Sequence, residues 1–132
     1  MRGLDAFLED ASAKRFQDGR WDCGLMVAAW VKAATGVDGA SAWRGRYSTR
    51  TGWLRILKRE GGIEAVIAKG AALAGLSETS EPKRGDIGIA RLPNGELMAG
   101  ICLGERWASA GLNGLAVCRA NSIRAWRVDC HN

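Results

Sequence analysis

Cys23 is the residue of this chain best placed for nucleophilic chemistry. It stands in the run Asp22-Cys23-Gly24, where a polar loop meets an apolar stretch that continues to Trp30. We therefore expect the thiol at the N-terminus of a helix, whose partial positive charge stabilises a thiolate, the reactive form of cysteine. The base that such a thiol needs is missing nearby, because the single histidine of the sequence is His131.

The other cysteines are Cys102, Cys118 and Cys130, and no two of the four form a Cys-x-x-Cys pair. This spacing is not that of a usual zinc site, and a disulfide framework is typical of secreted chains that carry a signal peptide. We predict reduced thiols that act mostly as small core residues, with no metal site and no cofactor.

The first half of the sequence has helical periodicity. A helix from Asp22 to Ala34 is apolar on nearly all sides, which predicts a buried central element that ends at Gly36. The remaining helices are expected at residues 4–16, from a cap at Thr49 or Thr51 to Arg59, and from Ile63 to Ala74.

The character of the sequence changes after residue 82. Ile87–Arg91 and Leu97–Leu103 read as two strands joined by the turn Pro93-Asn94-Gly95. Further short strands are expected at residues 106–109, 115–118 and 125–128. Residues 1–132 are therefore predicted to form one α+β domain, with the Cys23 helix packed on a small antiparallel sheet.

Composition excludes some classes of protein. Hydrophobic residues make up 47% of the sequence and charged residues 25%, as in ordinary globular proteins. The longest strongly apolar stretch, Leu25 to Val31, is far shorter than the roughly 20 residues of a membrane span. The acidic residues among the first ten do not suit a secretory signal, so we expect synthesis and folding in the cytoplasm.

The net charge of +5 suits an acidic partner, and basic residues are densest between Arg44 and Arg59. Nucleic-acid binding would require exposed aromatic residues among these cations, or a reading motif. Trp53 lies on the expected buried face of its helix, so a solvated basic surface is the favoured interpretation. Nucleic-acid binding is kept as the weakest functional alternative.

Three features together resemble the NlpC-type cell-wall peptidases, a compact branch of the papain-like cysteine hydrolases. Asp22-Cys23 opens the central helix, Arg84-Gly85-Asp86 leads into a strand, and the next strand reads Met-Ala-Gly-Ile-Cys-Leu-Gly over residues 98–104. The chain is more similar still to a group of prophage proteins with an Arg-Gly-Arg-Tyr stretch like residues 44–47.

The resemblance implies roles for several residues. Cys23 would be the nucleophile, and Gln17, six residues earlier, would be the oxyanion donor. The family's histidine falls at Met98, which cannot serve as a base, and its third polar position falls near Ser109. Cys23 is thus half of a catalytic pair, and only a folded-back C-terminal tail would bring His131 to it.

We therefore expect a degenerate NlpC-like domain that serves a phage or prophage particle, in the tail, as a structural or binding module. Its partners would be other particle proteins, with peptidoglycan as a further candidate. The alternative is an active cysteine hydrolase that cleaves peptidoglycan peptides. Trp30, Trp53 and Trp126 are expected in the core. The expected contact residues are Trp21, Asp22, Trp43, Arg44, Arg46, Met98, Trp107 and Ser109.

Overall fold

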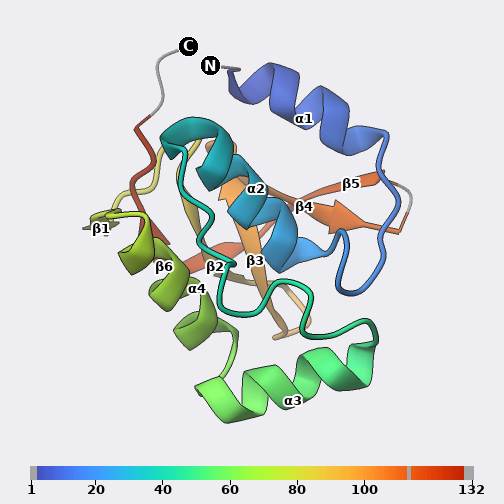
Figure 1. Ribbon diagram of the computed structural model, residues 1–132. Coiled ribbons are helices and arrows are strands. Elements are labelled where there is room, and N and C mark those ends of the chain that lie inside the picture. The colour runs from blue at the N-terminus through green and yellow to red at the C-terminus, as the bar shows by residue number, and fades with distance from the viewer. Residues whose placement is uncertain (1–2, 113, 130–132) are drawn as a thin grey trace.

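The computed structural model describes residues 3–112 and 114–129 of the chain. Its helices all precede its strands, as Figure 1 shows. The helices are α1 (Leu4–Ser12), α2 (Cys23–Thr35), α3 (Arg50–Glu60) and α4 (Ile63–Leu73). The strands are β1 (Glu78–Thr79), β2 (Ile87–Arg91), β3 (Leu97–Cys102), β4 (Arg106–Gly111), β5 (Gly114–Arg119) and β6 (Asn121–Trp126).

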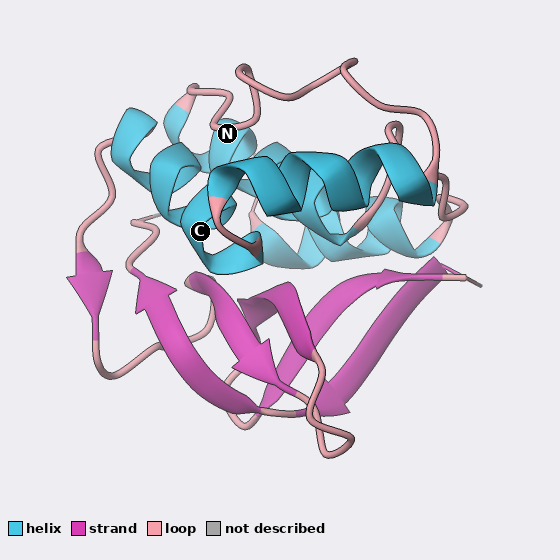
Figure 2. Ribbon diagram, turned by 90° about the horizontal axis from the view of Figure 1, so that it is seen from below, coloured by secondary structure: helices cyan, strands magenta, loops and turns pink. Residues whose placement is uncertain are grey.

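The strands form one antiparallel sheet in the order β1-β6-β2-β3-β4-β5. The helices lie on one side of this sheet, which is strongly bent (Figure 2). Helix α2 packs on β3 and β4, α4 packs on β2 and β3, and α3 contacts α4. The predicted α+β class is confirmed, and the central helix lies over the middle of the sheet.

Local signals set most of the helix ends. The Asp22 side chain caps α2, and Gly36 ends it in the left-handed conformation. Thr49 rather than Thr51 caps α3, by accepting a hydrogen bond from the Gly52 N–H. Helix α1 is shorter than expected and ends at Ser12, where the backbone of Gly114 on β5 lies against it.

The last strand differs from the prediction of 125–128. Strand β6 begins earlier and ends at Trp126, and β1, which pairs with it, was not predicted. The Val128 N–H donates to the carboxylate of Asp86 at 2.9 Å instead of to a neighbouring strand. Strand β6 therefore ends before Val128, whose backbone N–H is bound by the side chain of Asp86 in the turn before β2.

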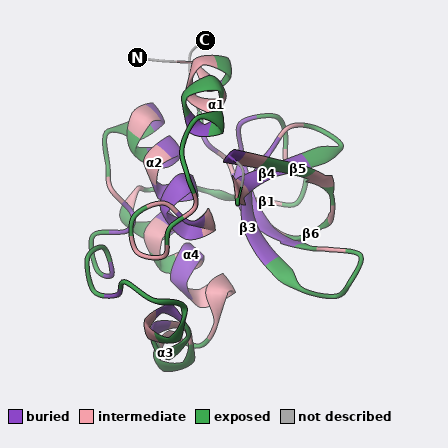
Figure 3. Ribbon diagram, turned by 90° about the vertical axis from the view of Figure 1, so that its right-hand side faces the viewer, coloured by how far each residue is buried: buried purple, intermediate pink, exposed green. Residues whose placement is uncertain are grey.

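The main core lies between the helices and the sheet. The α2 residues Met26, Val27 and Trp30 meet Ile89 and Ile101 there. The opposite side of α2 is also covered, because Leu25 and Ala28 pack into a second cluster with Trp43, Tyr47 and Trp53. Burial on both sides explains why α2 is apolar nearly all round, and in Figure 3 most of its ribbon has the colours of buried and intermediate residues.

A third, smaller cluster lies on the other face of the sheet. Trp107 on β4 is its largest member, and Ala90, Met98, Cys102 and Ala125 surround it. The indole reaches across β3 to β2, where a Cβ on Gly88 would lie 3.0 Å from the ring. The bend of the sheet thus lets its outer face bury a tryptophan.

Candidate functional site

Cys23 is the first residue of α2 and faces the sheet beside β3. Its thiol is in hydrogen-bonding contact with the Ala99 backbone and lies close enough to Asp22 and Arg50 for both charges to act on it. The residue keeps partial exposure and packs against the main core. The expected position at a helix N-terminus is therefore observed.

The electrostatics oppose thiolate formation. Burial is the largest influence and raises the pKa of Cys23 above its ordinary value, and the neighbouring Asp22 charge raises it further. Backbone contacts with Ala99 and Gly24 and the positive charge of Arg50 act in the other direction but are smaller. The raised pKa favours the thiol over the thiolate at neutral pH, in contrast to the activated cysteines of hydrolases.

Asp22 is a buried carboxylate with three donors around it. One oxygen accepts the Leu25 N–H at 2.9 Å and so caps α2. The other accepts the Gly19 N–H at 3.1 Å and the hydroxyl of Tyr47. Asp22 is therefore an internal anchor of the Cys23 loop and not a surface contact residue.

Tyr47 was not singled out by the sequence analysis. Its ring stacks on Trp53 with centroids 4.9 Å apart, and Trp43 lies 5.2 Å from Trp53. A Cβ on Gly24 would lie 3.2 Å from the Trp43 ring, so the aromatic cluster rests directly on the first turn of α2. The sequence feature that could have indicated its role is the position of the chain's single tyrosine between two tryptophans, in an otherwise basic and polar segment.

The predicted position of the missing base is wrong by one residue. Met98 lies in the Trp107 cluster, with its sulfur 3.9 Å from that of Cys118. Ala99 lies in the main core and is the residue beside the Cys23 thiol. Successive residues of a strand point to opposite faces, so Met98 is on the far side of the sheet.

Two of the remaining catalytic candidates, Gln17 and Ser109, lie within the described residues. Gln17 has an exposed side chain, and its backbone pairs with Trp21. The Ser109 hydroxyl donates to the Ala99 carbonyl at 3.2 Å, but strand alternation puts it on the Trp107 face. Cys130 and His131 lie outside the described residues.

The structure separates the predicted contact residues by exposure. Trp43 and Trp107 are 6% and 3% exposed, so neither ring is an open anchor. Trp21 is half-buried against Phe7, with the Lys14 ammonium 5.0 Å from its ring centre.

The two predicted contact arginines are both exposed. Arg44 forms an ion pair with Asp38 through two hydrogen bonds, and Arg46 is exposed as well. Trp30, Trp53 and Trp126 are buried as predicted.

Two polar atoms in the loop before Cys23 are buried without a hydrogen-bond partner in the described structure. They are Oδ1 of Asp18 and Nε1 of Trp21, an acceptor and a donor. Such atoms usually pair with water or a ligand. The cavity between α2 and α4 offers no substrate site, because it holds about 20 Å³ and its lining is mainly apolar.

No helix within residues 3–112 and 114–129 is long and apolar enough to cross a membrane. No group of three or more metal-ligating side chains occurs within the same residues.

The fold and site define an α+β protein in which a cysteine at a helix N-terminus contacts the backbone of Ala99 on β3 of an antiparallel sheet. The chain belongs to the family described as Domain of unknown function (DUF6950), whose model matches residues 1–128. No significant match was found among curated proteins or among solved structures.

Proposed function

We propose that this chain is a non-catalytic relative of the NlpC-type papain-like hydrolases that serves a phage or prophage particle, in the tail, as a structural or binding module. The observation that carries this proposal is that the Cys23 thiol meets β3 at the backbone of Ala99, whose side chain has no titratable group. An alanine methyl can neither take the thiol proton nor protonate a leaving amine. The assignment to a particle rests on the resemblance of the sequence to prophage proteins.

The Arg84-Gly85-Asp86 motif, which also resembles the family, makes structural contacts that do not depend on catalysis. The Trp30 indole on α2 donates to the Gly85 carbonyl at 2.8 Å. Asp86 accepts from Arg127 and from the Val128 backbone, each at 2.9 Å. The Arg84-Gly85-Asp86 turn thus ties the central helix, the sheet and the last described residues together. These contacts support the proposal that the fold serves a structural or binding role.

An active cysteine hydrolase on peptidoglycan peptides is the second candidate. The unpartnered atoms of Asp18 and Trp21, in the loop that leads to Cys23, favour it, since a bound peptide amide would satisfy both a donor and an acceptor. Residues 3–112 and 114–129 contain no histidine, so a conventional imidazole base for this function would come from outside them.

Site-resolved alkylation distinguishes the two candidates. The native protein is treated with iodoacetamide over a pH series, and modification is followed for each cysteine by peptide mapping. We expect Cys23 to react no faster than the half-buried Cys118, with a midpoint above the roughly 8.5 of a free thiol. The same protein in denaturant gives the reference rates. A Cys23 that reacts ten times faster than Cys118, with a midpoint below 8 or so, would establish the hydrolase instead.

Particles provide the second test. A strain that lacks the chain is complemented with the wild-type sequence or with Cys23→Ala, and purified particles are assayed for the protein, for infectivity and for wall digestion. We expect both versions to be incorporated and to restore infectivity equally. Incorporation of Cys23→Ala with loss of wall digestion would overturn the non-catalytic assignment. Absence of the wild-type protein from particles would overturn the particle assignment.

A further inference from the structure

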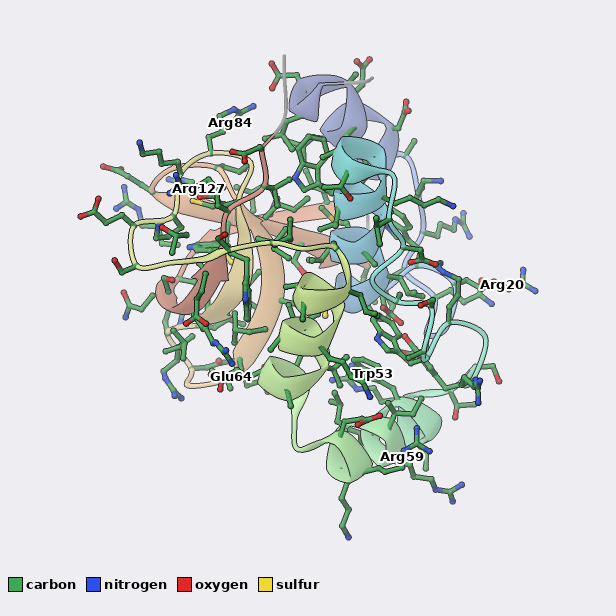
Figure 4. The ribbon with its side chains drawn as sticks, turned by 60° about the vertical axis from the view of Figure 1, so that its left-hand side comes forward. Arg20, Trp53, Arg59, Glu64, Arg84 and Arg127 are labelled. Atoms are coloured by element: carbon green, nitrogen blue, oxygen red, sulfur yellow. The ribbon has the colours of Figure 1, made fainter. Side chains whose placement is uncertain are left out.

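One side of α3 carries a concentrated positive charge. We define the α3 basic face as Arg50, Leu54, Arg55, Lys58 and Arg59, all of which are exposed. Their spacing places Arg50, Leu54 and Lys58 on one helical row and Arg55 and Arg59 on the adjacent row. The opposite side of the helix is buried through Trp53 and Ile56. Figure 4 shows Trp53 on the inner side and Arg59 extending away from the protein.

The cations of this face have no ion-pair partner among the described residues. Some arginines elsewhere are paired, as in Arg84 with Asp5 and Arg124 with Glu78, and others such as Arg20 and Arg106 are exposed without an ion pair in the described part of the chain, but on α3 four such cations share one side of a helix. The one acidic residue of α3, Glu60, lies on the other side and pairs with Lys69 of α4 at 3.9 Å.

Like charges four residues apart, such as Arg55 and Arg59, repel one another and weaken a helix. This repulsion is present in the free protein and would be relieved by bound carboxylates. The electrostatics of α3 therefore favour an acidic partner over a bare surface.

Leu54 distinguishes between kinds of acidic partner. It is 51% exposed and stands between Arg50 and Lys58 on the same helical row. An apolar side chain there gains nothing from a phosphate backbone, but it can pack against an apolar side chain of a protein. The nearby aromatic rings that would stack on bases, Trp43, Tyr47 and Trp53, are all buried.

We propose that the α3 basic face docks an acidic segment of a partner protein, with carboxylates on the four cations and an apolar side chain on Leu54. The 11-residue helix is about 16 Å long, which matches roughly three turns of a partner helix. This inference rests on the proposed role as a binding module and names its surface and the chemistry of its partner.

The test uses the full chain and a fluorescein-labelled helical peptide with glutamates and a leucine on one face. Fluorescence anisotropy at low salt measures its affinity. A second peptide with glutamine in place of every glutamate, and a short DNA duplex, are measured alongside. We expect micromolar binding of the acidic peptide, weakening as salt rises, and at least tenfold weaker binding of the glutamine peptide.

Two charge-matched variants locate the surface. Arg55→Glu with Arg59→Glu lowers the net charge from +5 to +1, and Lys83→Glu with Arg106→Glu, on exposed residues away from α3, lowers it equally. We expect the first pair to weaken acidic-peptide binding at least tenfold and the second to change it less than twofold. Leu54→Ser should weaken binding of the acidic peptide several-fold. Circular dichroism verifies that each variant is folded.

Three outcomes would overturn the inference: no binding of the acidic peptide, equal weakening by both charge-matched pairs, or tighter binding of the DNA duplex that Leu54→Ser leaves unchanged. The last would assign this face to nucleic acid. The reactivity of Cys23 is measured separately, on the protein without peptide, so a failure here is distinct from a failure of the non-catalytic assignment.

Discussion

The hydroxyl of Tyr47 donates a hydrogen bond to the buried carboxylate of Asp22, which lies 25 residues earlier in the chain. Asp22 caps the helix that begins with Cys23, and Tyr47 belongs to the loop that precedes α3. This one contact joins the start of the central helix to the segment that carries the basic face. The geometry of the Cys23 loop therefore depends on a residue far from it in the sequence.

The ionisation of Tyr47 should be coupled to unfolding. Burial, and next the hydrogen bond to Asp22, raise its pKa above the ordinary value of 10.0. The neutral phenol therefore stabilises the folded state fully below about pH 10, and this stabilisation falls as the pH rises further, because the unfolded chain releases the proton first. Since Tyr47 is the single tyrosine, phenolate absorbance reports on it alone. We expect that absorbance to rise together with the loss of near-ultraviolet circular dichroism.

The control is Tyr47→Phe, which keeps the ring stack but removes the donor. It should cost about 1–3 kcal/mol of unfolding free energy at neutral pH, because a buried carboxylate loses a partner. Its alkaline stability curve should lack the decline assigned to the phenol. A reversible titration of Tyr47 near pH 10 in the folded protein would contradict this account.

A histidine at position 98 should not activate Cys23. Met98 lies on the far face of the sheet, so Met98→His should leave the alkylation rate of Cys23 within about twofold of wild type. Ala99→His puts an imidazole beside the thiol and should lower the Cys23 pKa and accelerate alkylation near neutral pH. Ala99 is fully buried, so a cost of about 1–3 kcal/mol in stability is expected. Acceleration by Met98→His but not by Ala99→His would reverse the register described above.

Gly88 should not tolerate a side chain. A Cβ there would lie 2.6 Å from the Arg124 carbonyl oxygen and 3.0 Å from the Trp107 ring. Gly88→Ala should therefore lower the free energy of unfolding by about 1–3 kcal/mol, measured by urea denaturation. Ala116→Ser, at an exposed position of β5, serves as the control and should change it by less than about 0.5 kcal/mol. A neutral Gly88→Ala would mean that Trp107 does not lie over this strand.

The Asp86 carboxylate should matter far more than that of Asp38. Asp86 is 1% exposed and accepts hydrogen bonds from Arg127 and from the backbone of Lys83 and Val128. Asp86→Asn removes the charge that these donors face and should cost about 3 kcal/mol. Asp38→Asn weakens the exposed pair with Arg44 and should cost less than about 1 kcal/mol. Thermal denaturation of the two variants compares them directly, and equal losses would refute a structural role for the Asp86 turn.

The sequence by itself determined the elements that depend on local chemistry. Apolar periodicity and caps such as Asp22 and Thr49 place the helices, and Pro93-Asn94-Gly95 places the β2–β3 turn, because these signals act within a few residues. They also put Cys23 at a helix N-terminus. The resemblance to papain-like hydrolases came from the same local motifs and stays a proposal.

Only the tertiary structure decided what surrounds the thiol. Strand periodicity cannot tell which of Met98 and Ala99 faces the helix, because both are apolar and the bent sheet buries both of its faces. Burial, which raises the pKa of Cys23, and the Tyr47–Asp22 bond both arise from packing between distant segments. A helix terminus makes a cysteine available for chemistry, but the residues brought against it by the fold determine whether it ionises.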